Sequence, residues 1–113
     1  MSVLTSFQNY VGEWGNKIFN SKRGSGYNRT KHALSIVAHL EEEIEELKTA
    51  IKSKYTQAIA QETADCFLML LHIAYLYSFD LLERAVEKML INLKRTWGEP
   101  DEKGIIHHIG DKE

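Results

Sequence analysis

The sequence predicts an all-α protein, a bundle of four main helices, and three observations support this fold class. Apolar residues recur at spacings of three and four along most of the chain, which is the period of an amphipathic helix. Pro100 is the only proline, so long stretches are free of a helix breaker. No segment alternates between apolar and polar residues over more than a few positions, as a half-buried strand would.

Two helices are predicted in the N-terminal half. The first covers about residues 3–19, and its apolar stripe consists of Leu4, Phe7, Val11, Trp14 and Ile18. A polar loop that is rich in basic residues follows at residues 20–28. Thr30 is expected to cap the second helix. The apolar stripe of that helix comprises Leu34 or Val37, Leu40, Ile44, Leu47 and Ile51.

Two further helices are predicted in the C-terminal half. The third covers about residues 58–77, and the fourth begins after Asp80, which forms a capping-box pattern with Glu83. The fourth helix should stop near residues 97–100, and its buried positions are expected to be Leu82, Val86, Met89 and Leu93. We therefore expect one helical domain over residues 1–98 and a polar tail over residues 99–113.

The composition favours a globular protein of the cytoplasm. A hydrophobic content of 43% and a charged content of 27% are typical of soluble domains, and the formal net charge of −2 argues against a nucleic-acid-binding surface. Cys66 is the only cysteine, so no internal disulfide is expected. The uncharged run at residues 66–79 has 14 residues, too few to cross a membrane, and the first residues do not resemble a signal peptide.

Two pairs of carboxylates with the same spacing lie on the second and third predicted helices. Glu43 and Glu46 stand beside the apolar stripe of the second helix, and Glu62 and Asp65 open the most apolar stretch of the chain. Residues three apart share a helix face, and burial of an unpaired carboxylate is costly, so a cation is expected opposite them. Four carboxylates on neighbouring helices suit Mg²⁺, or Mn²⁺ as a substitute, because these ions prefer oxygen ligands.

Simpler interpretations remain open for each pair taken alone. An acid-rich run such as residues 41–46 is usually a solvated helix face. Glu62 and Asp65 can be the polar first turns of a core helix, stabilised by the helix dipole. A non-catalytic helical module that dimerises through its apolar stripes, with the acids facing solvent or a partner, is the alternative function.

The acidic pairs and the fourth helix resemble the all-α NTP pyrophosphohydrolases, the MazG-like superfamily. The resemblance rests on residues 42–47 followed by Glu62-Thr63-Ala64-Asp65, and on residues 88–98, which are similar to a Lys-x-x-x-Asn-x-x-Arg segment of that superfamily. The Arg29-Thr30-Lys31 start of the second helix and the Trp-Gly-x-Pro-Asp segment at residues 97–101 resemble its dATP/dGTP pyrophosphohydrolase-like branch. The resemblance covers roughly residues 7–108.

This resemblance implies a Mg²⁺-dependent hydrolase that cleaves an NTP or dNTP to a monophosphate and pyrophosphate and so cleans the nucleotide pool. It implies that Glu43, Glu46, Glu62 and Asp65 bind the metal. Glu42 would assist the metal or orient and deprotonate the attacking water. It also implies a homo-oligomer, a dimer or tetramer, which the extensive apolar faces of so small a chain favour as well. A nucleotide sensor that binds without hydrolysis would carry the same residues.

Cationic side chains are the candidates for binding the phosphates of such a substrate. Lys88, Asn92 and Arg95 share one stripe of the fourth predicted helix and are the leading contacts. Lys31 and the basic loop at residues 22–29 are second-rank candidates.

Two tryptophans are the candidates for stacking on the base. Trp14 falls on a core stripe, so packing is its alternative role, and Trp97 follows the fourth helix and can be a packing anchor instead. His72 lies about two turns from the acids of the third helix, so we expect a hydrogen-bonded core histidine there. Cys66 has no basic neighbour in sequence and is expected to be a core residue.

Overall fold

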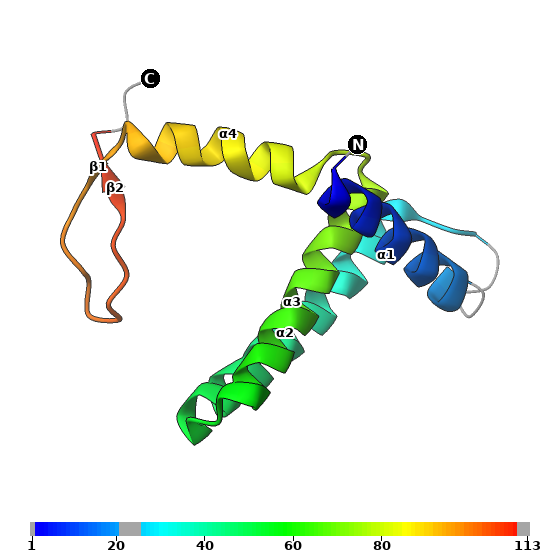
Figure 1. Ribbon diagram of the computed structural model, residues 1–113, viewed down its shortest axis with the longest axis horizontal. Helices are drawn as coiled ribbons and strands as arrows, with labels where there is room; N and C mark the ends of the chain where they lie inside the picture. The colour runs from blue at the N-terminus through cyan, green and yellow to red at the C-terminus, as the bar shows by residue number, and fades with distance from the viewer. Residues whose placement is uncertain (1, 21–25, 111–113) are drawn as a thin grey trace. The chain divides into compact units, whose positions relative to one another are not determined.

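The computed structural model describes residues 2–20 and 26–110, which form four α-helices and one short β-hairpin (Figure 1). The all-α fold class is confirmed, and the hairpin is an addition that the sequence pattern did not predict. The elements are α1 (Val3–Asn20), α2 (Arg29–Ser53), α3 (Thr56–Leu76), α4 (Leu81–Leu93), β1 (Thr96–Trp97) and β2 (His108–Ile109).

The chain divides into two compact units, residues 1–81 and residues 82–113, and each is described by itself. In the first unit α2 and α3 lie side by side along their length as a helical hairpin, and α1 packs on α3 (Figure 1). The turn between α2 and α3 passes through Lys54, which ends α2 in the left-handed conformation with φ 62°. Its backbone N–H donates to the carbonyl of Ile51, so one of the last carbonyls of α2 has a partner.

Helix α2 begins one residue before the cap that the sequence predicted. Asn28 has an extended backbone, and its side-chain oxygen accepts a hydrogen bond of 2.9 Å from the backbone N–H of Lys31. Asn28 is therefore the N-cap. The prediction that Thr30 caps the helix is wrong, because Thr30 already lies in the first helical turn.

The buried face of α2 differs from the predicted stripe. Ile36, Glu43 and Ala50 stand seven residues apart on the buried face, with His32 and Ala33 beside Ile36. The predicted stripe is wrong in part: Leu40 and Leu47 are half-buried, whereas Leu34, Val37, Ile44 and Ile51 are exposed by 37–61% in the single chain. Helix α2 thus carries apolar residues on more than one face. The face that packs on α3 contains Ala33 and Ala50, whose small side chains allow the two helices to approach closely.

Helix α3 supplies the core of the first unit. Leu71 and Ala74 are fully buried, and His72 and Leu76 nearly so. Met69 and Ile73 pack against a cluster of Ala33, Ile36 and Leu76.

Two glycines set how closely α1 approaches α3. A Cβ atom at Gly12 would stand 1.9 Å from the ring of Tyr75, and one at Gly15 would stand 2.5 Å from the imidazole of His72. Side-chain atoms in proteins do not approach each other so closely. Any residue larger than glycine at these two positions would therefore clash with the neighbouring ring.

The second unit consists of the rest of α4 and the hairpin. Helix α4 ends at Leu93, earlier than predicted, and β1 pairs antiparallel with β2 so that Thr96 faces Ile109 and Trp97 faces His108. The prediction that four α4 residues are buried is wrong for the single chain. These residues are exposed by 41–73%: Leu82, Val86, Met89 and Leu93.

No single helix in the described part of the chain is long and apolar enough to span a membrane, and α3 and α4 pass that test only together, as a bent pair.

Gln8 connects α1 to the turn after α3, and its loss should destabilise the first unit. The side chain is 4% exposed; its Nε2 donates to the carbonyl of Phe79 at 2.7 Å, and its Oε1 accepts from the backbone N–H of Leu81 at 3.0 Å. Gln8→Ala leaves both backbone groups without their partner. We expect urea denaturation to show a loss of about 2–3 kcal/mol in the free energy of unfolding.

The matched control is Gln61→Ala, since Gln61 is exposed on α3. Its effect should stay within about 0.5 kcal/mol. A Gln8→Ala protein as stable as the control would contradict the role of this side chain.

Candidate metal centre

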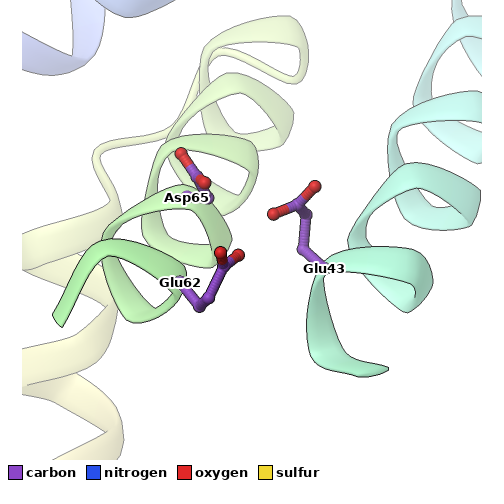
Figure 2. Close-up of side chains that lie close together, drawn as sticks. All are labelled: Glu43, Glu62 and Asp65. Carbon is purple, nitrogen blue, oxygen red and sulfur yellow. The ribbon is translucent and has the colours of Figure 1, made fainter. Parts of the chain in front are cut away.

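Three carboxylates from two helices converge in the first unit. Figure 2 shows the side chain of Glu43 extending from α2 toward Glu62 and Asp65 on α3. One oxygen of each of the three carboxylates lies within 4.8 Å of an oxygen of the other two. Glu62 and Asp65 share a face because they are three residues apart on a helix, and Glu43 meets them because it lies on the buried face of α2.

Two of these carboxylates contain an oxygen that is buried and has no hydrogen-bond partner among the residues that the structure describes. Oε1 of Glu43 and Oε1 of Glu62 have this property, and Glu43 as a whole is 9% exposed. Burial raises the pKa of the Glu43 carboxyl above its ordinary value of 4.5, and the adjacent Glu62, Glu46 and Asp65 raise this pKa further. An unpartnered buried acceptor and neighbouring like charges are both costly, so a cation bound here would lower that cost.

A divalent ion fits these residues. The donor set is made of carboxylate oxygens alone, which Mg²⁺ and Mn²⁺ prefer. Glu43, Glu62 and Asp65 would hold the ion, and it would give Oε1 of Glu43 and Oε1 of Glu62 a partner that the described part of the chain does not supply. Cys66, next to Asp65, is partly buried, and burial raises the pKa of its thiol, with Glu43, Asp65 and Glu62 raising it further.

The other two predicted acidic residues have different surroundings. Glu46 is exposed, yet its charge raises the pKa of Glu43, and it borders a second cavity of about 440 Å³ together with Glu62. Glu42 is exposed on α2 and is not a member of the three-carboxylate cluster. Metal binding by Glu46 and the water-activating role of Glu42 stay predictions.

A cavity of about 480 Å³ borders the carboxylates, because Asp65 contributes to its wall. Helix α1 supplies an aromatic side, and α2 and α3 supply the remaining walls. The cavity is lined by Phe7, Tyr10, Val11, Trp14, His32, Ser35, Ile36, His39, Asp65, Leu68, Met69 and His72. A concave, mostly apolar cavity with a few polar side chains is typical of a small-molecule site. The sequence predicted one aromatic residue of this wall, Trp14, which is 52% exposed rather than packed in the core.

Two buried histidines contribute polar groups to the wall of this cavity. The rings of His32 and His72 meet edge to face with centroids 5.2 Å apart. His72 Nε2 lies 3.2 Å from Oδ1 of Asn16, which confirms the expectation of a hydrogen-bonded core histidine. His32 is 1% exposed, and its Nδ1 lies 3.1 Å from the hydroxyl of Tyr27.

The predicted phosphate contacts lie in both units. Lys31 is exposed in the first turn of α2, and residues 21–25 of the basic loop lie outside the described residues. Lys88 is exposed on α4, and Arg95 follows the end of that helix instead of lying on its stripe. Arg95 Nη1 donates to Oδ1 of Asn92 at 3.3 Å.

Trp97 contacts Asn92 as well, in the same unit as Arg95. Its indole Nε1 donates to the carbonyl of Asn92 at 3.2 Å, and its ring meets the ring of His108 edge to face. Three of the predicted substrate-binding residues, Asn92, Arg95 and Trp97, are thus joined by hydrogen bonds.

His39 had no predicted role, yet it lines the cavity and contacts the carboxylate cluster. Its Nε2 lies 3.4 Å from Oε2 of Glu43. The signal in the sequence is the spacing of four residues between His39 and Glu43, which places the two side chains on adjacent turns of one helix face. Phe7, Tyr10, Ser35 and His32 were also missed, since only tertiary packing brings them around one cavity.

The raised pKa of Glu43 predicts how the stability of the metal-free protein depends on pH. The unfolded chain releases the Glu43 proton at a lower pH than the folded chain, so stability is lost as pH rises above the ordinary value of 4.5. Glu43→Gln removes this loss. In thermal unfolding with EDTA from about pH 5 to about pH 8, we expect the melting temperature of the parent to fall more steeply than that of the variant.

Glu41→Gln is the control, because Glu41 is exposed on the same helix. Its curve should run parallel to that of the parent. Parallel curves for Glu43→Gln and the parent would contradict the proposed burial of charge.

Comparison with known families identifies the superfamily to which this arrangement belongs. The MazG nucleotide pyrophosphohydrolase domain matches residues 31–95, more than half of the chain. The matched region contains Glu43, Glu62 and Asp65, and it includes the complete α3 and α4. No curated protein and no solved structure gives a significant match. The chain therefore belongs to the MazG nucleotide pyrophosphohydrolase domain family.

Proposed function

We propose that this protein is a Mg²⁺-dependent pyrophosphohydrolase that converts an NTP or dNTP and water to the monophosphate and pyrophosphate. The observation that carries the proposal is the cluster of Glu43, Glu62 and Asp65 beside a cavity of about 480 Å³, in a chain of the MazG family. Such an activity would remove surplus or non-standard nucleotides from the pool of the cytoplasm.

The carboxylates account for the metal-dependent part of the reaction. When bound, a divalent ion neutralises charge on phosphate oxygens and lowers the pKa of a bound water. Glu43, Glu62 and Asp65 would hold the ion, and Glu46 would extend the set from the next turn of α2. Glu42, exposed on the same helix, would orient the attacking water and accept its proton.

The cavity accounts for binding of the base. Its wall includes the exposed face of Trp14 together with Phe7 and Tyr10, and aromatic side chains stack on any base. Asp65 belongs to both the cavity wall and the carboxylate cluster. A nucleotide whose base lies in the cavity would therefore have its phosphates near the cluster. Lys31, Lys88, Asn92 and Arg95 are the proposed phosphate contacts.

We also propose that the protein acts as a homo-oligomer. The outer face of α2 and the length of α4 leave apolar side chains exposed in the single chain, among them Leu34, Ile51, Met89 and Leu90. Exposed apolar residues that recur along a helix are typical of a surface that another subunit covers.

The activity itself is tested by pyrophosphate release from a panel of dNTPs and NTPs with Mg²⁺. Glu46→Gln and Asp65→Asn should each lower kcat/KM at least about a hundredfold, because several kcal/mol of charge stabilisation depend on the metal. The control is Glu45→Gln, since Glu45 pairs with Lys48 on the exposed side of α2.

The outcomes separate the alternative functions. Metal binding without pyrophosphate from any nucleotide would favour a nucleotide sensor over an enzyme. A protein that binds no divalent metal would favour the helical interaction module, because its acidic residues would then be a solvated or partner-binding face.

Trp14→Ala tests the cavity as the site of the base. Loss of stacking should raise KM for the best nucleotide about tenfold while kcat changes less than about threefold, because base stacking contributes about 1–3 kcal/mol. Trp97→Ala measures the other candidate in the same assay. A KM that rises for Trp97→Ala and not for Trp14→Ala would place the base on the second unit instead.

A further inference from the structure

His39 touches both parts of the candidate site. It lies one helical turn before Glu43 on α2, and its Nε2 is 3.4 Å from Oε2 of that carboxylate. The same imidazole forms part of the wall of the cavity that Trp14 and Asp65 also line. The side chain of His39 is 52% exposed and that of Glu43 is 12% exposed, so the histidine stands at the solvent side of a nearly buried acid.

This contact restricts the orientation of the Glu43 carboxylate. A glutamate side chain has three rotatable bonds, and holding it in one rotamer costs conformational entropy. With the proton on Nε2, the neutral imidazole presents an N–H group toward Oε2. Oε1 is then the Glu43 oxygen that is buried without a partner in residues 2–20 and 26–110, and it is the one available to a cation.

Partners of this kind are known to matter for metal sites in general. Side chains that contact a ligand from outside orient it, and their removal typically lowers metal affinity about 10–100-fold. Glu43 is the single α2 member of the three-carboxylate cluster, whereas Glu62 and Asp65 both lie on α3. A misoriented Glu43 would therefore leave the three-carboxylate cluster with its two α3 members only.

We propose that His39 is a positioning residue, which holds Glu43 toward Glu62 and Asp65 and so sets the metal affinity of the centre. The inference rests on the proposed function only in that the carboxylates bind a divalent ion. It does not require that the protein hydrolyse a nucleotide.

Two substitutions separate the N–H group from the shape of the ring. His39→Phe keeps a ring at the cavity wall and removes the donor. His39→Gln loses the ring and keeps an amide N–H at a similar distance from the backbone. Because His39 is half exposed, both variants should fold, and circular dichroism and melting in EDTA check this. The control is Lys48→Gln, which breaks an exposed pair with Glu45 on the same helix.

The measurement is Mn²⁺ binding to the full chain, followed by electron paramagnetic resonance of the free ion. His39→Phe should bind Mn²⁺ about tenfold more weakly than the parent, while His39→Gln and Lys48→Gln stay within about twofold. Where the protein hydrolyses nucleotides, excess Mn²⁺ should restore the kcat of His39→Phe, since the positioning role acts through metal occupancy.

The outcomes distinguish this inference from the proposed function. A parent that binds Mn²⁺ but releases no pyrophosphate ends the enzymatic proposal and leaves the His39 comparison intact. His39→Phe with parental affinity overturns the positioning role, as does His39→Gln if it loses as much affinity as His39→Phe. A parent that binds no Mn²⁺ overturns both.

Discussion

The burial of one carboxylate between α2 and α3 is the constraint on which the candidate site depends. Glu43 lies on the inner face of α2, seven residues after Ile36 and seven residues before Ala50, and both of these apolar residues are buried on the same face. An apolar residue there would stabilise the hairpin more simply, because a buried charge without a partner is costly. The chain retains a glutamate and sets Glu62 and Asp65 against it. The folded state therefore carries a local electrostatic cost that a divalent cation would offset.

The packing of α1 shapes the neighbouring cavity. Gly12 and Gly15 receive the rings of Tyr75 and His72, so α1 lies close to α3 along this stretch. The aromatic residues that flank these glycines, Tyr10 and Trp14, remain exposed at the cavity. Close approach at two glycines thus leaves a concave aromatic surface next to the carboxylates, where a flat apolar group and a charged group of one ligand can bind together.

Much of the site could be predicted from local pattern, and the errors have physical causes. The spacing of Glu62 and Asp65 was sufficient to predict that their side chains lie together, because a helix places residues three apart on one face whatever its surroundings. The face of α2 was predicted incorrectly, since apolar residues such as Leu34 and Ile44 form a second stripe that competes with the one containing Ile36. The cap at Asn28 and the end of α4 at Leu93 depend on backbone conformation, which the hydrophobic period does not report.

The sequence by itself determined the helical class, the approximate extent of α1 and α3, and two acidic pairs that lie within the region matched by the MazG family. These features are local, because helix period and the spacing of residues on one helix need no tertiary information. Only the tertiary structure decided that Glu43 turns inward, that His39 contacts it, and that residues of α1, α2 and α3 enclose one cavity. Those features depend on which of the two apolar faces of α2 is turned toward α3. The fit of side chains between the two helices decides this.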